Sequence, residues 1–162
     1  MRSYEFTLVA KLNREFDAFA GALFAAGCDD ATISLQRGLA ILDFERDAKS
    51  FGHALKSAMD DVARAGVECL RIEPDSLVSI SDIAARAGFT RAAASNYAKG
   101  ARGKAFPSPV MRVTSESPLW DWVDVARWLF RQGKLPLAEL VRARIVKREN
   151  EALRGGQRAA AA

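Results

Sequence analysis

The sequence has little of the residues on which catalytic and metal centres most often depend. Its 162 residues include one histidine, His53, and two cysteines, Cys28 and Cys69. Two cysteines are too few for a disulfide framework or a cysteine-rich zinc site, so we expect both to be packing residues. The carboxylate pair Asp60-Asp61 is expected on a solvated surface, and no phosphate loop or nucleophile–base signature is present. The sequence therefore predicts no enzyme activity, no cofactor and no metal.

Long apolar runs are also missing. No segment approaches the roughly 20 apolar residues that span a bilayer. The N-terminal residues alternate and carry charge, unlike a secretory signal peptide. Hydrophobic residues make up 49% and charged residues 27% of the chain, a balance typical of globular proteins. We therefore expect a cytoplasmic protein with no membrane partner.

Acidic residues are absent from one stretch, residues 83–115, which holds six basic residues. Residues 1–75 carry 9 Lys and Arg against 13 Asp and Glu, a net charge of −4, whereas residues 76–162 carry 15 against 7, a net charge of +8. Such asymmetry between two halves of a chain predicts that the basic half meets a polyanion. The alternative is a basic face that is simply solvated.

The first 75 residues alternate between strand and helix periodicity. The pattern predicts, in order, a strand over 4–10, a helix over 16–24 with Phe24 on its apolar face, strands over 31–36 and 39–44 joined at Arg37-Gly38, a helix over 51–62 and a strand over 67–72. This βαββαβ order is that of a ferredoxin-like fold, which serves many functions. We interpret residues 1–75 as a dimerisation or sensing module.

Residues 80–99, ISDIAARAGFTRAAASNYAK, have the pattern of a helix-turn-helix motif. Ser81 is expected to cap the first helix, and the small Ala84 lets the second helix cross closely. Gly88 supplies the positive φ that the turn requires, and Thr90 is expected to cap the second helix.

One residue of this motif departs from the usual pattern. Ala94 occupies a core position at which such motifs usually carry valine or isoleucine, and we expect Phe89 or Tyr97 to fill the space. The alternative interpretation of the segment is an αα-hairpin within a helical core.

The outer face of the second helix has side chains suited to DNA. Arg91 and Asn96 can form bidentate hydrogen bonds with guanine and adenine, and Ala92 permits close approach to a thymine methyl group. The hydroxyl and lysine side chains can contact phosphates. The predicted DNA contacts on this helix are Thr90, Arg91, Ala92, Ser95, Asn96 and Lys99.

The following segment, FPSPVMRVTSESPLWDWVDVARWL at 106–129, adds a second pattern. Residues 79–131 resemble the MerR/excisionase-type winged helix-turn-helix DNA-binding domain, on the matching residues Phe106-Pro107, Pro109-Val110, Trp120 and the helix Val123–Leu129. The residue pattern predicts a short strand around 110–114. The resemblance implies a basic wing along a phosphate backbone, so that binding weakens steeply with salt. The wing residues it implies are Arg102, Lys104 and Arg112.

Three tryptophans, Trp120, Trp122 and Trp128, invite two interpretations. They could stack on the bases of single-stranded nucleic acid, or they could anchor the core of a small domain. Their spacing favours the core.

The sequence thus predicts an α+β protein with a ferredoxin-like domain followed by a winged helix-turn-helix and a C-terminal helix. The expected segments are a module over 1–75, a DNA-binding domain over 76–133, a basic amphipathic helix over 134–154 and a flexible tail over 155–162. The predicted function is sequence-specific binding of double-stranded DNA by a prokaryotic-type transcriptional regulator, either a repressor or an autoregulating antitoxin. The first module is expected to bind a second copy or a protein partner. The alternative is an adaptor that binds a protein or metabolite through the first module.

Overall fold

The computed structural model describes residues 1–100 and 105–161. The chain forms two compact units: Met1–Pro74 together with the chain from Arg148 onward, here called the sheet unit, and Asp75–Lys147, here called the helical unit. Within the described residues there are six helices and an antiparallel four-stranded sheet, which confirms the predicted α+β class.

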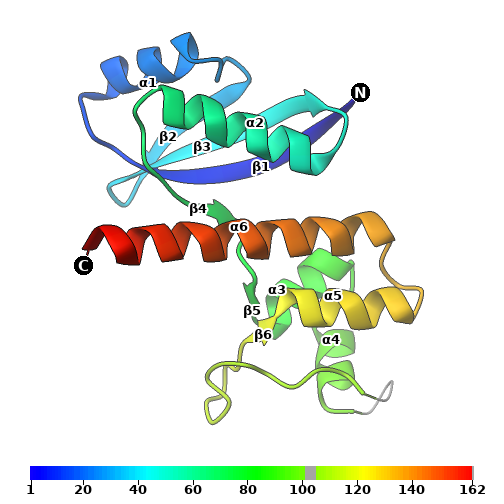
Figure 1. The fold of residues 1–162 in the computed structure, drawn as a ribbon. Coiled ribbons are helices and arrows are strands. Elements are labelled where there is room, and N and C mark those ends of the chain that lie inside the picture. Colours follow the sequence, from blue (N-terminus) through cyan, green and yellow to red (C-terminus); the bar gives the residue numbers. More distant parts are fainter. Residues whose placement is uncertain (101–104, 162) are drawn as a thin grey trace. The chain divides into compact units, whose positions relative to one another are not determined.

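The sheet unit is built on four antiparallel strands in the order β2-β3-β1-β4. The strands are β1 (Arg2–Lys11), β2 (Ala31–Gln36), β3 (Leu39–Ala48) and β4 (Cys69–Glu73). Helices α1 (Phe16–Ala25) and α2 (Phe51–Arg64) cover one face of this sheet (Figure 1). The expected hairpin at Arg37-Gly38 is confirmed: both residues have positive φ, 51° and 81°, as a tight type I′ turn requires.

The core of the sheet unit comes from alternate residues of its strands. Phe6 and Leu8 of β1 and Leu42 of β3 are buried under the two helices, as period-2 patterning predicts. The expectation for Phe24 is wrong, because its side chain is 67% exposed. Helix α1 packs through other positions, chiefly the fully buried Leu23, and the next residue along the helix projects sideways into solvent.

A buried arginine joins the sheet to α2. The Arg46 guanidinium donates to both carboxylate oxygens of Asp30 at 2.7 and 2.8 Å, to Asp61 at 2.8 Å, to Ser57 Oγ at 3.1 Å and to the carbonyl of Gly27 at 2.9 Å. The side chain of Asp61 is only 15% exposed. The expected solvated surface is therefore wrong for this carboxylate, because Arg46 draws it inward.

The last helix, α6 (Leu137–Ala161), contributes its later residues to the sheet unit. It remains helical through Gly155 and Gly156 to Ala161, where the sequence predicts a flexible tail from residue 155. The alanines at its end are strong helix formers, and Gln157 Nε2 donates to the carbonyl of Leu70 at 2.7 Å.

Helix α6 also covers the free edge of β4. The side-chain amide of Asn150 accepts from Ile72 N at 2.8 Å and donates to Ile72 O at 3.0 Å. These are the hydrogen bonds that a further strand would make, so Asn150 satisfies an edge that would otherwise be open.

The described residues of the helical unit form two very short strands and three complete helices. They are β5 (Leu77–Val78), α3 (Ile80–Ala87), α4 (Arg91–Ala98), β6 (Trp120–Asp121) and α5 (Trp122–Arg131), followed by the first residues of α6. The strand expected over 110–114 is absent; the described residues there form only an isolated bridge between Met111 and Leu119. Arg112, at φ +53°, turns the chain out of the extended conformation immediately after that bridge.

Five aromatic rings form a connected series through the core of the helical unit, here called the aromatic chain. Phe89 contacts Tyr97, Tyr97 contacts Trp128, Trp128 contacts Phe106 and Phe106 contacts Trp120, with ring centroids 5.1–6.4 Å apart. Trp120 Nε1 also donates to the carbonyl of Pro107 at 3.0 Å. All three tryptophans are buried, so their predicted place in the core is confirmed.

Candidate nucleic-acid interface

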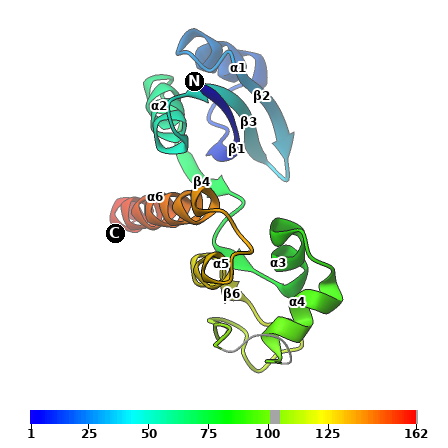
Figure 2. The same cartoon turned by 90° about the vertical axis from the view of Figure 1, so that its right-hand side faces the viewer.

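The turn between α3 and α4 has the conformation that the sequence predicts. Gly88 ends α3 in the left-handed region at φ 74°, and the next amide, Phe89 N, donates to the carbonyl of Ala84 at 2.9 Å. The two helices leave this turn in different directions (Figure 2). Ala84 and Ala94 are both buried, which lets the two helices approach closely.

The cap of α3 differs from the expected one. Ser79, not Ser81, precedes the first helical residue: Ser79 Oγ accepts from Asp82 N at 3.2 Å, and Asp82 Oδ2 accepts from Ser79 N at 2.9 Å. This reciprocal pair is a capping box. Ser81 consequently lies in the first turn of α3 with an exposed side chain.

The cap of α4 is confirmed. Thr90 Oγ1 accepts from Ala93 N at 3.1 Å, while the Thr90 side chain remains exposed. The hydroxyl therefore retains its own proton for donation to an outside acceptor.

The predicted contact residues of α4 differ in their position around the helix. Arg91, Ala92 and Lys99 are exposed, and Ser95 and Asn96 are half-buried. The spacing places Ala92, Asn96 and Lys99 opposite the buried Ala94, whereas Arg91, at the first position of the helix, lies closer to the side of Ala94. The helix carries no acidic residue.

Arg91 is held in a defined orientation. Its Nε donates to Ser81 Oγ at 3.1 Å. Within residues 1–100 and 105–161, neither the terminal nitrogens of Arg91 nor the side-chain amide of Asn96 has a protein hydrogen-bond partner. The guanidinium thus keeps the paired N–H groups that bidentate recognition uses.

Arg86 is basic but inward-facing. It donates to the carbonyl of Asp75 at 2.9 Å, and its guanidinium carbon lies 5.4 Å from the centroid of the Trp122 ring. Burial lowers the pKa of Arg86, against the opposing effect of Asp82 and Asp75. One of the six basic residues in 83–115 therefore anchors the fold.

The expected wing is only partly described. Arg102 and Lys104 lie outside the described residues. Arg112 is exposed in a tight turn, where its carbonyl accepts from Ser115 N at 3.0 Å and Ser115 Oγ at 2.9 Å. Sequence reasoning missed that its neighbours Val110 and Val113 are exposed, because a short apolar run reads as a buried strand.

Lys134 is a further basic residue that the sequence did not single out. Its Nζ lies 5.8 Å from the centroid of the Tyr97 ring, which brings a cation from beyond α5 to the last turn of α4. No local pattern announces it, because the contact joins residues 37 positions apart in the chain.

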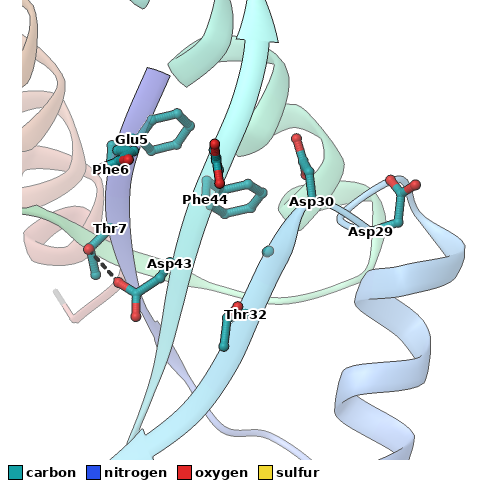
Figure 3. Close-up of a pocket in the computed structure, with 10 residues that line it drawn as sticks. Glu5, Phe6, Thr7, Asp29, Asp30, Thr32, Asp43 and Phe44 are labelled. Carbon is teal, nitrogen blue, oxygen red and sulfur yellow. Dashed lines mark hydrogen bonds between the residues drawn. The ribbon is translucent and has the colours of Figure 1, made fainter. Parts of the chain in front are cut away.

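The sheet unit has a groove of the opposite charge (Figure 3). The groove has a volume of about 600 Å³, and Thr7 Oγ1 within it donates to Asp43 Oδ1 at 2.6 Å. Its acidic lining residues are Glu5, Asp29, Asp30, Asp43 and Glu45. Such a lining repels phosphates, so this groove does not suit a nucleic-acid backbone.

The two cysteine thiols and the histidine lie in the sheet unit and do not belong to α3 or α4. Burial raises the pKa of both Cys28 and Cys69 to about 11, so neither thiol is ionised at neutral pH. His53 is exposed in the first turn of α2, where its Nδ1 lies 2.8 Å from Ser50 Oγ.

Comparison with models of protein families, with curated proteins and with solved structures finds no match. None of the helices among the described residues has the length and apolar character needed to cross a membrane. The case for a function therefore rests on the contacts and charges of the residues themselves.

Proposed function

We propose that the helical unit binds double-stranded DNA sequence-specifically, and that the protein is a cytoplasmic transcriptional regulator. In this proposal α3, the Gly88 turn and α4 are a winged helix-turn-helix, and α4 enters the major groove by its N-terminal end. The sheet unit is a ferredoxin-like module that binds a second copy or a protein partner. Its strand order, with two helices on one face, supports that fold.

The observation that carries the proposal is the state of Arg91. It lies at the first position of α4, exposed, oriented through Nε by Ser81. A guanidinium held in this way is ready to bind the O6 and N7 atoms of guanine without a large loss of side-chain freedom.

The surroundings of Arg91 favour the same ligand. Ala92 adds no bulk beside it, and Asn96 offers an amide of the kind that pairs with adenine. Lys99 supplies charge one further turn along α4. The stretch 83–115 contains no acidic residue that would repel a phosphate backbone.

The test is a selection of bound sequences from random duplex DNA with the full chain, followed by fluorescence anisotropy in rising salt. We expect R91A and N96A to relax base preference at separate positions, each by about 1–3 kcal/mol of discrimination. K99A should weaken binding to all sequences alike and lower the salt slope by about one.

Lys49 provides a matched control, because it is an exposed lysine on the acidic sheet unit. K49A should leave affinity and salt slope unchanged. Failure of the wild-type chain to bind any duplex, or binding that ignores salt, would rule out the proposal and leave the adaptor role through the sheet unit. Equal weakening by R91A, N96A and K99A would mean that α4 is not the helix that reads bases.

A further inference from the structure

The four-stranded sheet has two edges, and only one of them is covered. At the β4 edge, Asn150 and Gln157 of α6 form hydrogen bonds with the strand backbone. The other edge is β2, which has β3 as its only neighbour among the described strands (Figure 2). An uncovered edge strand presents N–H and C=O groups that can pair with another chain. A further strand can therefore be added to the sheet at β2.

The sequence of β2 has none of the features that usually prevent such pairing. Natural edge strands carry lysine, proline, a β-bulge or an inward-pointing charge. The strand reads ATISLQ, with no charged residue and no proline, and it pairs one-to-one with β3 over its whole length. The side chain of Leu35 is 46% exposed. This edge is therefore uncharged, uninterrupted and partly apolar, which favours the addition of a strand.

The hairpin at Arg37-Gly38 determines which backbone groups of β2 point outward. In a two-residue hairpin the residues that flank the turn form a hydrogen-bonded pair, and the pattern then alternates along the strand. The bond from Glu45 N to Asp30 O, at 3.1 Å, follows this alternation. The N–H and C=O groups of Ile33 and Leu35 consequently point away from β3, toward the free edge.

The pattern of side chains selects one register for a second copy. When two β2 strands run antiparallel about a two-fold axis at Ile33, each Ile33 lies opposite its copy, and each Leu35 lies opposite Ala31 of the other chain. These residues pair with buried residues of β3, so they share the helix-covered face, and the apolar face continues across the line between the two strands, here called the seam. A shift by one residue would set Ile33 opposite Ser34, whose side chain lies on the other face.

Charges at the two ends of β2 are complementary in this register. Asp29 precedes the strand and Arg37 follows it, and both side chains are exposed. The antiparallel arrangement sets Asp29 of each chain opposite Arg37 of the other, so an ion pair closes each end of the seam. The acidic residues of β3 lie about 14 Å from their copies, at three strand spacings. This exceeds the Debye length of about 8 Å at physiological salt, so their repulsion is screened.

We infer that β2 pairs with β2 of a second copy, antiparallel about a two-fold axis at Ile33, and that the two sheets become continuous across the seam. This inference rests on the proposed function for the choice of a second copy as partner, and it names the surface that the copy occupies. The seam involves one strand of six residues from each chain, so its contact area is small and the dimer should be weak and reversible.

The test is sedimentation velocity of the full chain, without DNA, from low-micromolar to near-millimolar concentration. The wild-type chain should convert reversibly from monomer to dimer as the concentration rises. L35P should abolish the dimer, because proline removes an outward N–H group while the pairing of β2 with β3 is kept. Circular dichroism checks that this variant is folded.

An exchange of charges tests the register without proline. R37D sets carboxylates opposite each other at both ends of the seam, and D29R sets guanidinium groups opposite each other there. Each substitution should weaken the dimer about tenfold, because both ends change at once. The double variant D29R/R37D should restore the wild-type dissociation constant, because the ion pairs form again with their signs exchanged. K49D is the control, since Lys49 is an exposed cation of the same unit that lies outside β2, and it should leave dimerisation unchanged.

Three results would overturn the seam. The first is a wild-type chain that stays monomeric at every concentration. The others are a dimer that L35P leaves intact and a dimer that the charge exchange does not restore, because either places the contact elsewhere. DNA binding is measured separately. A monomeric chain that still selects duplex sequences overturns the seam alone, whereas a dimer that binds no duplex overturns the proposed function and leaves the seam standing.

Discussion

The two units stabilise their interiors with different chemistry. The sheet unit buries the charge of Arg46 and satisfies it with two carboxylates, a hydroxyl and a carbonyl. The helical unit packs the aromatic chain into its core, where Trp120 Nε1 donates to the carbonyl of Pro107. A polar network tolerates few substitutions, because every partner left behind is a buried group without a hydrogen bond. Ring packing depends on area and shape instead.

The units also differ in what they leave exposed. In the sheet unit, Asn150 and Gln157 occupy the backbone groups of β4 that could pair with another chain. In the helical unit, Met111 and Val113 remain open to solvent. Exposed apolar side chains also occur in the sheet unit, where Phe24 is 67% exposed, and what distinguishes Met111 and Val113 is that they lie close together in the sequence.

The largest effect expected from this comparison is that of R46A. Removing the guanidinium leaves Asp30 without its cation and Asp61 with Arg64 alone, and we expect a loss of about 3–5 kcal/mol in the free energy of unfolding. Hydrogen exchange read by mass spectrometry should show lost protection in β1 and β3 while α3 and α4 keep theirs. K49A serves as the control. Equal loss of protection in α4 would show that the two units do not differ in what stabilises them.

A smaller effect is expected for N150A. The substitution removes both hydrogen bonds to Ile72 and should reduce the free energy of unfolding by about 2 kcal/mol, because a buried amide and carbonyl lose their partners. Urea unfolding followed by circular dichroism measures the change. N150D separates the two bonds: the carboxylate can still accept from Ile72 N but cannot donate to its carbonyl. Wild-type stability in both variants would contradict the assignment of Asn150 as the cover of the β4 edge.

The smallest effect is expected for S81A. Loss of the hydroxyl removes the acceptor of Arg91 Nε, so the guanidinium regains freedom and DNA affinity should fall by about 0.5–1 kcal/mol. The decrease in affinity should be confined to duplexes that carry the base preferred by Arg91, which is the base whose preference R91A relaxes. Double-mutant analysis checks this, since S81A should add nothing in an R91A background. Full additivity of the two substitutions would show that Ser81 contacts DNA independently.

Local chemistry explains which features of α3, α4 and the turn between them the sequence could predict. Gly88 and Thr90 act on residues within three or four positions, and both were placed correctly. The capping box could also have been found, because Ser79 has an acidic residue three positions later whereas Ser81 has Ala84 there. The expected cap at Ser81 is wrong because only Ser79 has the acidic partner that a capping box needs.

The remaining features depend on contacts between distant parts of the chain. Arg46 meets Asp30 and Asp61 from 16 and 15 positions away, and Asn150 meets Ile72 across 78 positions. Hydrophobic periodicity along the sequence does not indicate which distant residues will pair. Arginine is seldom buried unless it is paired, so the burial of Arg46 could be predicted only with its distant partners known. For the segment 106–119 the sequence shows which residue types are present but not which of them are buried, so the exposure of Val113 could not be predicted.

The cover over β4 has a consequence for the order in which the protein matures on the ribosome. Residues up to Pro74 leave the exit tunnel first, but Asn150 and Gln157 follow only after the whole helical unit has been translated. While the roughly seventy residues of the helical unit are translated, at roughly 5–20 residues per second, the free edge of β4 remains uncovered. The free edge of β4 is therefore the last part of the sheet unit to be covered as the chain is made.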